Sequence, residues 1–432
     1  MPHRVSIHLY RKAQHSCPRG RSVEPSLNPS PMPPRSRLRS YQQVFPSPQI
    51  RPKSSLIHFS DYRSGVPDFL TEAQSKLQQQ ADTLARQLSE IELDASNSQQ
   101  VQLQTTELSK DAGLFALTQP IEYGGLGATA LELTVVRDAL GRRNVGHLPG
   151  IFGPNPGLLA QATEEIKQKF LEPYLAGETS SGFGFTEPSD AERHTWAQLD
   201  GEELVINGAK SYVTGGSNAD FINTLVEVDD VGPAMILIET SRPGVELERS
   251  FSSVDGSHHA SFTFTNVRVP KSHVIGEAGA GMTRALEQVN AVRMAIAADC
   301  VGLCSFVCAL VADHIESTNN PSDKDHATRV QFGRMRTKAF AARSSVYRTA
   351  RLIDADENSV NEVMASKVLA SETIAELVDT AIQVVGGEAL IDSHPLASIF
   401  RRIRASRLAE GPTDVLHANI SRGYLDLNLG RI

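Results

Sequence analysis

Cysteine is scarce in this sequence, and long apolar runs are missing. Four cysteines in 432 residues are too few for a disulfide-stabilised scaffold, and their scarcity fits a reducing, intracellular compartment. Cys300, Cys304 and Cys308 recur at intervals of four among Ala, Val and Leu, which favours small buried residues on one helix face over a metal site. No uninterrupted run of about 18 apolar residues occurs, so we expect no membrane-spanning helix.

Acidic residues are almost absent from the first 60 positions. Ten Lys/Arg and one acid, Glu24, give this segment a charge of +9, so the rest of a chain whose total is −8 carries −17. An acidic body argues against nucleic acid as the main partner. The Arg-, Ser- and Pro-rich composition predicts a disordered or targeting extension over residues 1–65. It is similar to a mitochondrial transit peptide, which predicts mitochondrial localisation; the cytosol, the peroxisome and a non-native extension are the alternatives.

The spacing of apolar residues divides the remaining chain into three parts. Helical spacing over 66–181 indicates an N-terminal helical domain. Residues 182–278 contain short β-branched and aromatic runs with a tight turn at Asp200-Gly201, which indicates a small β-domain. Helical spacing returns over 279–432, and it predicts a C-terminal four-helix bundle and an α+β fold class. The long segments of this last part that lack internal proline are 279–317, 322–355 and 359–385.

Glu410 is the candidate catalytic residue. A helical run rich in arginine stops at Gly411-Pro412, because these residues end helices, and Glu410 stands directly before the stop. A carboxylate held there beside apolar residues can act as a general base when partial desolvation raises its pKa. The local residues alone favour the alternative, an exposed glutamate at a helix end. We expect the side chain to face a closed cavity if the catalytic interpretation holds.

Several segments together resemble the acyl-CoA dehydrogenase family. Residues 381–417 are similar to its C-terminal signature of Gln-x-x-Gly-Gly, an acidic-x-x-Pro-Leu segment, an Arg-rich strip and Glu-Gly-Thr. Residues 117–127 resemble its Pro-x-x-Tyr-Gly-Gly-x-Gly segment, and 154–188 resemble the helix that leads into Thr-Glu-Pro. The counterparts in the C-terminal signature are Gln383, Gly386, Gly387, Asp392, Pro395, Arg401, Arg404 and Glu410-Gly411.

The resemblance implies a flavin-dependent oxidoreductase that contains FAD and acts on an acyl thioester. In this family a carboxylate removes the α-proton while the β-hydrogen leaves as hydride to flavin N5, and Glu410 matches that base. Phe185 and Thr186 match the strand that contacts the flavin ring. Tyr212 and Thr214 match residues that flank the ring and hydrogen-bond near N5. Ordinary strand residues are the alternative for this last pair.

Other positions match the parts of the family that bind the ends of the cofactor and the substrate. Gln383, Gly386 and Gly387 match the segment that receives the adenosine diphosphate part of FAD from a neighbouring subunit; a plain helix C-cap is the alternative. Thr413 completes the Glu-Gly-Thr motif. Asn290 and Arg293, three apart on one helix face, match the pair that holds the nucleotide end of coenzyme A. A surface salt bridge is the alternative for the arginine.

Three departures from the family pattern put FAD retention in question. Asp190 and Glu192 stand where the family has a diphosphate-binding Ala-Gly-Ser-Asp, and they would repel a diphosphate unless Arg193 or His194 compensates. The bundle carries no Arg-x-x-Phe-Gly at the aligned position, 315–321. Pro412 is inserted before Thr413 and alters the loop behind the base.

Three functional hypotheses follow from these matches. The first is α,β-dehydrogenation of an acyl-CoA or other acyl thioester by a homodimer or homotetramer that assembles through the C-terminal bundle. The second is a flavin-independent proton-transfer enzyme, an isomerase, lyase or cyclase, on the same scaffold. The third is an inactive partner subunit, which the presence of Glu410 disfavours. The acyl chain, its carrier and the electron acceptor are not specified by the sequence.

Overall fold

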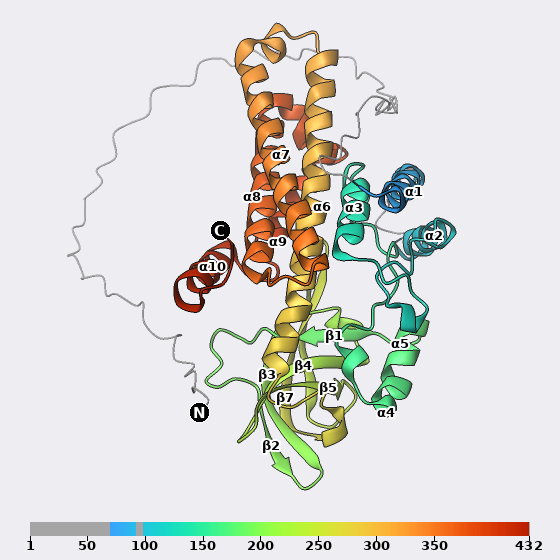
Figure 1. Cartoon of the computed structure of the whole chain (residues 1–432), viewed down its shortest axis with the longest axis vertical. Coiled ribbons are helices and arrows are strands. Elements are labelled where there is room, and N and C mark those ends of the chain that lie inside the picture. The colour runs from blue at the N-terminus through green and yellow to red at the C-terminus, as the bar shows by residue number, and fades with distance from the viewer. Residues whose placement is uncertain (1–69, 92–97, 432) are drawn as a thin grey trace, which may run out of the picture. The chain divides into compact units, whose positions relative to one another are not determined.

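The computed structural model describes residues 70–91 and 98–431. The expectations for the basic N-terminal extension lie outside these residues. Figure 1 shows a helical N-terminal part, a β-sheet and a C-terminal helical part in chain order, and the predicted α+β class is confirmed. The N-terminal helices are α1 (Glu72–Leu88), α2 (Ser98–Asp111), α3 (Ala130–Gly141), α4 (Glu164–Ile166) and α5 (Glu172–Ala176).

The start of α3 is fixed both by its own sequence and by a distant helix. Thr129 and Glu132 form a capping box, in which each side chain accepts a hydrogen bond from the other's backbone N–H. The Asp354 carboxylate, at the end of α7 (His326–Asp354), accepts from the backbone N–H of Ala130 at 2.7 Å. These contacts hold α3 against the C-terminal helices, where it packs on α6 (Gly281–Ser317).

The middle part is one sheet in the order β1-β4-β2-β3-β7-β6, with β5 paired to β4. The predicted hairpin is confirmed: β2 and β3 are antiparallel, Asp200 faces Glu203, and Gly201 takes the left-handed φ of +63° that the tight turn requires. A register shift in β3 between Lys210 and Val213 marks a bulge. The strands are β1 (Ser181–Gly184), β2 (Trp196–Asp200), β3 (Glu203–Thr214), β4 (Phe221–Val228), β5 (Gly232–Glu239), β6 (Val245–Ser252) and β7 (His258–Pro270).

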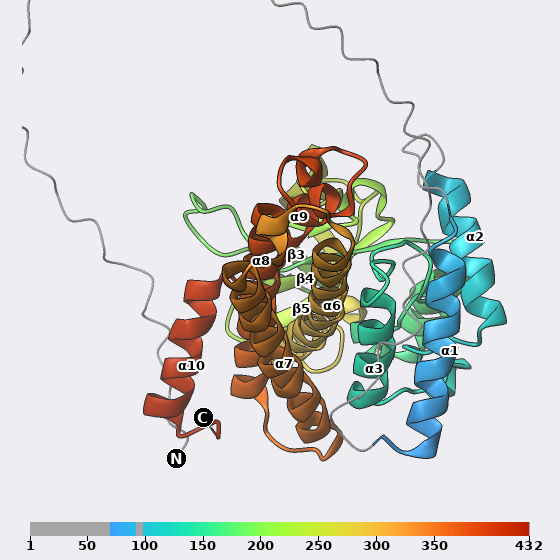
Figure 2. The same cartoon turned by 90° about the horizontal axis from the view of Figure 1, so that it is seen from above.

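Helix α6 joins the sheet to the C-terminal helices. Its first residue, Gly281, lies so close to β5 that a Cβ there would be 2.6 Å from the Ala234 backbone. By length and composition alone, α6 is apolar enough to cross a membrane, with a mean hydropathy of 2.2 over its most apolar 18 residues. That window is 67% buried within the protein, as expected for the central helix of a bundle. Figure 2 shows α3, α7 and α8 around it.

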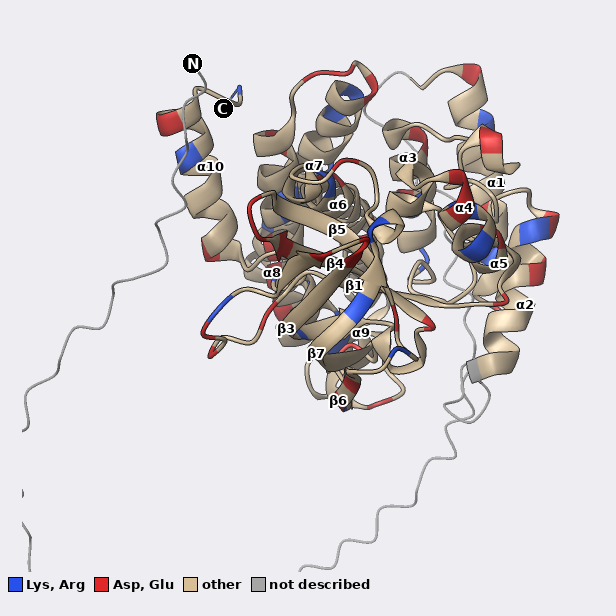
Figure 3. Ribbon diagram, turned by 90° about the horizontal axis from the view of Figure 1, so that it is seen from below, with Lys and Arg blue, Asp and Glu red and all other residues tan. Residues whose placement is uncertain are grey.

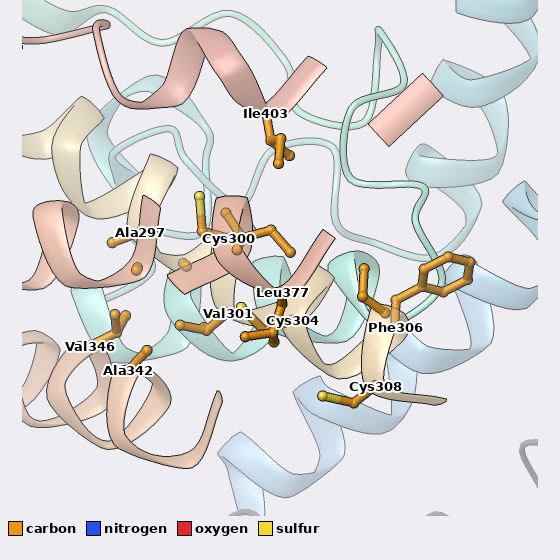
Figure 4. Close-up of a cluster of buried hydrophobic side chains, with 14 of the residues drawn as sticks. Ala297, Cys300, Val301, Cys304, Phe306, Cys308, Ala342, Val346, Leu377 and Ile403 are labelled. Carbon is orange, nitrogen blue, oxygen red and sulfur yellow. The ribbon is translucent and has the colours of Figure 1, made fainter. Parts of the chain in front are cut away.

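The long C-terminal helices match the predicted segments. α6, α7 and α8 (Val360–Val385) pack on one another, and α9 (Pro395–Ser406) and α10 (Thr413–Leu427) pack on α8. Cys300, Cys304 and Cys308 are buried, and Figure 4 shows them within the cluster of buried hydrophobic side chains. Burial raises the pKa of the Cys300 thiol to about 12, so this thiol is unreactive at neutral pH. Acidic and basic residues are interspersed over the helices and the sheet in Figure 3.

Candidate functional site

The loop that carries Glu410 has an unusual backbone. It connects α9 to α10, and Pro412 occupies the N-cap of α10 with Thr413 as the first helical residue. Glu410 has a φ of +54° and Gly411 a φ of +110°. A Cβ on Gly411 would be 2.9 Å from the Leu416 side chain, so this position requires glycine. A glutamate in the left-handed region is uncommon, and the surrounding contacts must hold it there.

Two cations from different helices provide those contacts. The Arg293 Nε of α6 donates to the Glu410 carbonyl oxygen at 2.8 Å. The Lys367 Nζ of α8 donates to the Gly411 carbonyl oxygen at 3.0 Å. Lys367 is fully buried, and burial lowers its pKa to about 8. Because both groups bind main-chain oxygens, they fix the loop and leave the Glu410 carboxylate available.

The electrostatics of Glu410 suit a general base. Its side chain is half-buried, and burial raises the pKa of the carboxyl while the charges of Arg293 and Lys367 oppose the rise. Within the described ranges no group donates a hydrogen bond to the carboxylate. A carboxylate that is partly desolvated and unpaired accepts a proton more readily than one in water.

A cavity of about 250 Å³ lies beside this loop, and we name it the α6–α9 cavity. It reaches Ala409, the residue before Glu410, but Glu410 itself is not part of its wall. Neither this cavity nor the larger one described next has Glu410 in its wall, so these two spaces do not meet the expectation that its carboxylate faces a closed cavity. The cavity is lined by Gly141, Asn144, Gly146, His147, Asp255, Ile296, Asp299, Cys300, Leu303, Arg402, Ile403, Ala405, Ser406 and Ala409.

A second, larger cavity of about 640 Å³ lies between α3, α6 and the adjoining ends of α7 and α8. Arg137 lines this cavity, and its partner Asp299, at 3.0 Å, lines the α6–α9 cavity. The ion pair thus stands between the two spaces. Asn290 lines the larger cavity, and its Oδ1 accepts from Arg293 Nη1 at 2.8 Å. Arg293 is 7% exposed. Its hydrogen bonds in the structure are to the Glu410 carbonyl oxygen and to Asn290. Its role toward coenzyme A remains a prediction.

The sheet residues matched to the flavin ring lie at the ends of β1 and β3. Phe185 follows β1 and stacks on Phe183, and the adjacent Thr186 accepts a hydrogen bond from the Ser211 backbone at 2.8 Å. Tyr212 stands in the β3 bulge with a φ of +55° and is 59% exposed. A large aromatic side chain this exposed at a strained position is available to a planar ligand.

Thr214 belongs to a chain of hydrogen bonds that leads to the α6–α9 cavity. Its hydroxyl lies 3.3 Å from Nδ1 of His259, whose Nε2 lies 2.9 Å from the Ser257 hydroxyl. The Ser257 hydroxyl donates to Asp255, which lines the cavity, at 2.7 Å. The chain therefore connects the β3 end to the space beside Glu410. No sequence signal pointed to His259 or Asp255.

The segment after β1 contains Asp190 and Glu192, two of the departures from the family pattern. Lys210, which is 1% exposed, donates to Glu187 at 2.7 Å and so ties the end of β1 to β3. Arg193 pairs with Asp229, and His194 contacts Glu187. The acids that contact Arg193 and His194 in this structure are thus Asp229 and Glu187, and compensation of Asp190 and Glu192 beside a diphosphate stays a prediction.

Gln383, Gly386 and Gly387 lie far from the loop that carries Glu410. They are exposed at the C-terminal end of α8, and Gly386 ends the helix with a φ of +82°. Lys367 lies in the same helix, about 24 Å away at 1.5 Å per residue. The structure does not bring these three residues to Glu410, which is compatible with the predicted contact to a cofactor of another subunit.

The residues present fit a bound FAD ring. The Thr413 hydroxyl is buried and has no hydrogen-bond partner within the described part of the chain, although buried polar groups are normally satisfied. It stands three residues from Glu410, and the exposed Tyr212 offers an aromatic surface on the sheet. A cofactor with hydrogen-bonding ring atoms would provide a partner for the Thr413 hydroxyl and would cover the exposed Tyr212 ring. Thr413 was among the residues expected from the sequence.

The comparisons with known proteins agree with the fold. A family model described as acyl-CoA dehydrogenase, N-terminal domain, matches residues 71–178, and one described as acyl-CoA dehydrogenase, C-terminal domain, matches 279–425. The chain is 27% identical over 332 residues to a 3-(aryl)acrylate reductase of Clostridium sporogenes, covering 72% of this chain and 88% of that protein. It is 27% identical over 318 residues to the mitochondrial isobutyryl-CoA dehydrogenase of Dictyostelium discoideum, covering 70% and 76%.

A solved structure shows the same fold. The probable acyl CoA dehydrogenase from Mycobacterium abscessus superposes with a TM-score of 0.71 at 24% identity, covering 82% of this chain and 98% of that one. The similarity extends over the helical and sheet parts together.

Proposed function

Because this chain belongs to the acyl-CoA dehydrogenase family, we propose that it oxidises an acyl thioester between its α- and β-carbons, with Glu410 taking the α-proton. It is a flavin-dependent oxidoreductase, and its cofactor is FAD. The observation that carries the proposal is the held loop: two buried cations fix the backbone at 410 and 411 and leave an unpaired, half-buried carboxylate. The relatives are dehydrogenases and reductases, which does not favour the flavin-independent alternative.

Different residues of this chain would bind the cofactor, accept the proton and position the base. Thr413, Thr214, Tyr212 and the Phe185-Thr186 segment would hold FAD, which supplies a hydride acceptor when bound. Glu410 accepts the α-proton at its carboxylate. Arg293 and Lys367 keep that carboxylate in place through its backbone, and such positioning lowers the activation barrier.

The proposal is tested by the spectrum of the purified protein. We expect a flavin that is reduced anaerobically, with loss of its visible absorbance, when a saturated acyl-CoA is added. A reductase is distinguished by the reverse experiment, in which reduced protein is reoxidised by an α,β-unsaturated thioester but the oxidised protein does not react with the saturated one. A protein that neither contains nor accepts FAD would overturn the assignment.

We predict a pH dependence governed by Glu410. Burial holds its pKa above the usual value of 4.5, and only the ionised form accepts a proton. The value of kcat/KM should therefore fall on the acid side with a midpoint above 4.5. A profile that is flat down to pH 4.5 would remove Glu410 from the proton transfer.

The variant Arg293→Met should move that midpoint further up. The substitution removes a charge that lowers the pKa of Glu410 and the donor that holds its carbonyl oxygen. We expect kcat/KM to fall by about a hundredfold, the effect of a misplacement of the order of 1 Å. Arg284→Met, on the same helix but bonded to Gln161, is the control. A lower activity with an unchanged midpoint would contradict the electrostatic part of this role.

We further propose that copies of the chain assemble through the C-terminal helices, as a dimer or a tetramer. Leu390 and Ile391, which follow α8, are exposed by 69% and 56%, and Phe400 on α9 is exposed by 51%. Large apolar side chains gathered this way favour a protein interface. They adjoin Gly386 and Gly387, which are matched to cofactor binding across subunits. Light scattering of the holoenzyme should give a multiple of 46.9 kDa; a strict monomer would contradict the proposal.

A further inference from the structure

The α6–α9 cavity contains a cation that has no carboxylate partner. Arg402 donates to the side-chain oxygen of Asn144, and no acid pairs with it among the residues that the structure describes. Burial lowers the pKa of Arg402 to about 10, which means that its charge is poorly solvated. A guanidinium has five N–H donors, so most of its hydrogen-bonding capacity is left for the cavity.

The acids that line the same cavity do not neutralise this charge. Both oxygens of Asp299 are taken by the guanidinium of Arg137, at 3.0 and 3.3 Å. The carboxylate of Asp255 instead accepts from the backbone and the hydroxyl of Ser257. Asp299 is the acid that acts on Arg402, and it opposes the lowering of the arginine's pKa only in part.

The remaining polar group is uncharged at neutral pH. Burial, with Arg402 adding to it, lowers the pKa of His147 to about 4. The imidazole lines the cavity, and one of its nitrogens hydrogen-bonds to the Asn144 backbone, which leaves the other nitrogen for a ligand. The cavity therefore presents a cation and a neutral hydrogen-bonding group, while Ile296, Leu303 and Ile403 supply apolar walls.

The position of Arg402 relative to the loop suggests what it binds. Arg402 is one helical turn, about 6 Å, before Ser406 at the end of α9, and Ala409 closes the cavity beside Glu410. We propose, given the function above, that the acyl chain of the substrate is short and ends in a carboxylate that pairs with Arg402. The alternative is that Arg402 only ties α9 to the loop after α3 through Asn144.

Binding to a protein without turnover tests this inference. The background is Glu410→Gln, and the probes are two coenzyme A thioesters of equal chain length, one ending in a methyl group and one in a carboxylate. Calorimetry should show at least tenfold tighter binding of the carboxylate-ended thioester. Adding Arg402→Gln should weaken the binding of the carboxylate-ended thioester by about fiftyfold, the value of a charged hydrogen-bonded pair. It should change the affinity for the methyl-ended thioester by less than threefold.

Three further variants separate recognition from structure. Arg401→Gln, on the same helix but exposed and paired with Asp392, should change neither affinity. Arg402→Lys should retain part of the preference. Asn144→Ala removes the hydrogen bond between Asn144 and Arg402 but keeps the cation, so the preference for the carboxylate-ended thioester should remain. If Arg402 has only a structural role, this preference should be lost. Tighter binding of the methyl-ended thioester, or equal weakening of both by Arg402→Gln, would overturn the inference. Failure of the proposed function appears separately, as a protein with Glu410 whose flavin neither thioester reduces.

Discussion

Glu410→Gln should slow reduction of the flavin by an acyl thioester at least a thousandfold while the protein keeps its fold and its cofactor. General bases contribute factors of about 10² to 10⁴, and here the amide cannot accept the proton at all. The fold should survive because Arg293 and Lys367 bind the carbonyl oxygens at 410 and 411, not the side chain. Replacing an unpaired, half-buried carboxylate by a neutral isostere also removes a desolvation cost.

The measurement is the anaerobic decay of flavin absorbance after rapid mixing with substrate. Glu376→Gln is the matched control, because Glu376 is on α8, is 55% exposed and pairs with Lys338. It should leave the rate unchanged. A Glu410→Gln protein that reduces its flavin within threefold of the unaltered rate would show that another group takes the proton.

Much of the fold is predictable because its signals are local. The helices α6, α7 and α8 have long, uninterrupted periodicity, and Asp200-Gly201 has the turn chemistry that a two-residue hairpin requires. The expectation of no membrane-spanning helix is not contradicted by α6, because the buried central helix of a bundle passes the same test of length and composition. Asp299 interrupts the apolar run of α6, yet the mean hydropathy of its surroundings stays high enough for a spanning helix.

The candidate site was predictable only in part, because its contacts are not local. The stop at Gly411-Pro412 indicated a break in the helices near Glu410, but α9 ends earlier, at Ser406, and Glu410 lies in the turn before α10. The Arg293 contact that holds it joins residues 117 apart in sequence, and the Lys367 contact joins residues 44 apart. The three-residue spacing correctly predicted that Asn290 lies beside Arg293. It contained no information on the second partner of the guanidinium, the Glu410 carbonyl oxygen. The facing charges of the α6–α9 cavity were missed for the same reason.

The largest effect on stability is expected at Asp138, a buried acid on α3 that contacts Arg343 and Tyr347 of α7. Its Oδ2 lies 2.7 Å from Arg142 and 2.7 Å from Arg343, and it accepts from the Tyr347 hydroxyl at 2.6 Å. The side chain is fully buried. Burial alone would raise the pKa of Asp138, but the charges of Arg142 and Arg343 outweigh it and lower the pKa below 3.8.

Asp138→Asn should lower the free energy of unfolding by about 3–5 kcal/mol, because it leaves two partly buried guanidinium groups without their acid. The check is chemical denaturation at neutral pH. Asp392→Asn, an 88% exposed acid that pairs with Arg401, should change stability by less than about 0.5 kcal/mol. A loss below about 1 kcal/mol in Asp138→Asn would contradict this role.

The pH dependence gives the same prediction a second readout. A carboxyl whose folded-state pKa is depressed contributes stability that is present above its unfolded pKa and lost as pH falls through the folded one. The difference between the unaltered protein and Asp138→Asn should therefore be complete at pH 7 and should narrow below 3.8. A difference that stays constant into acid would mean that the substitution acts through packing and not through the charge that joins α3 to α7.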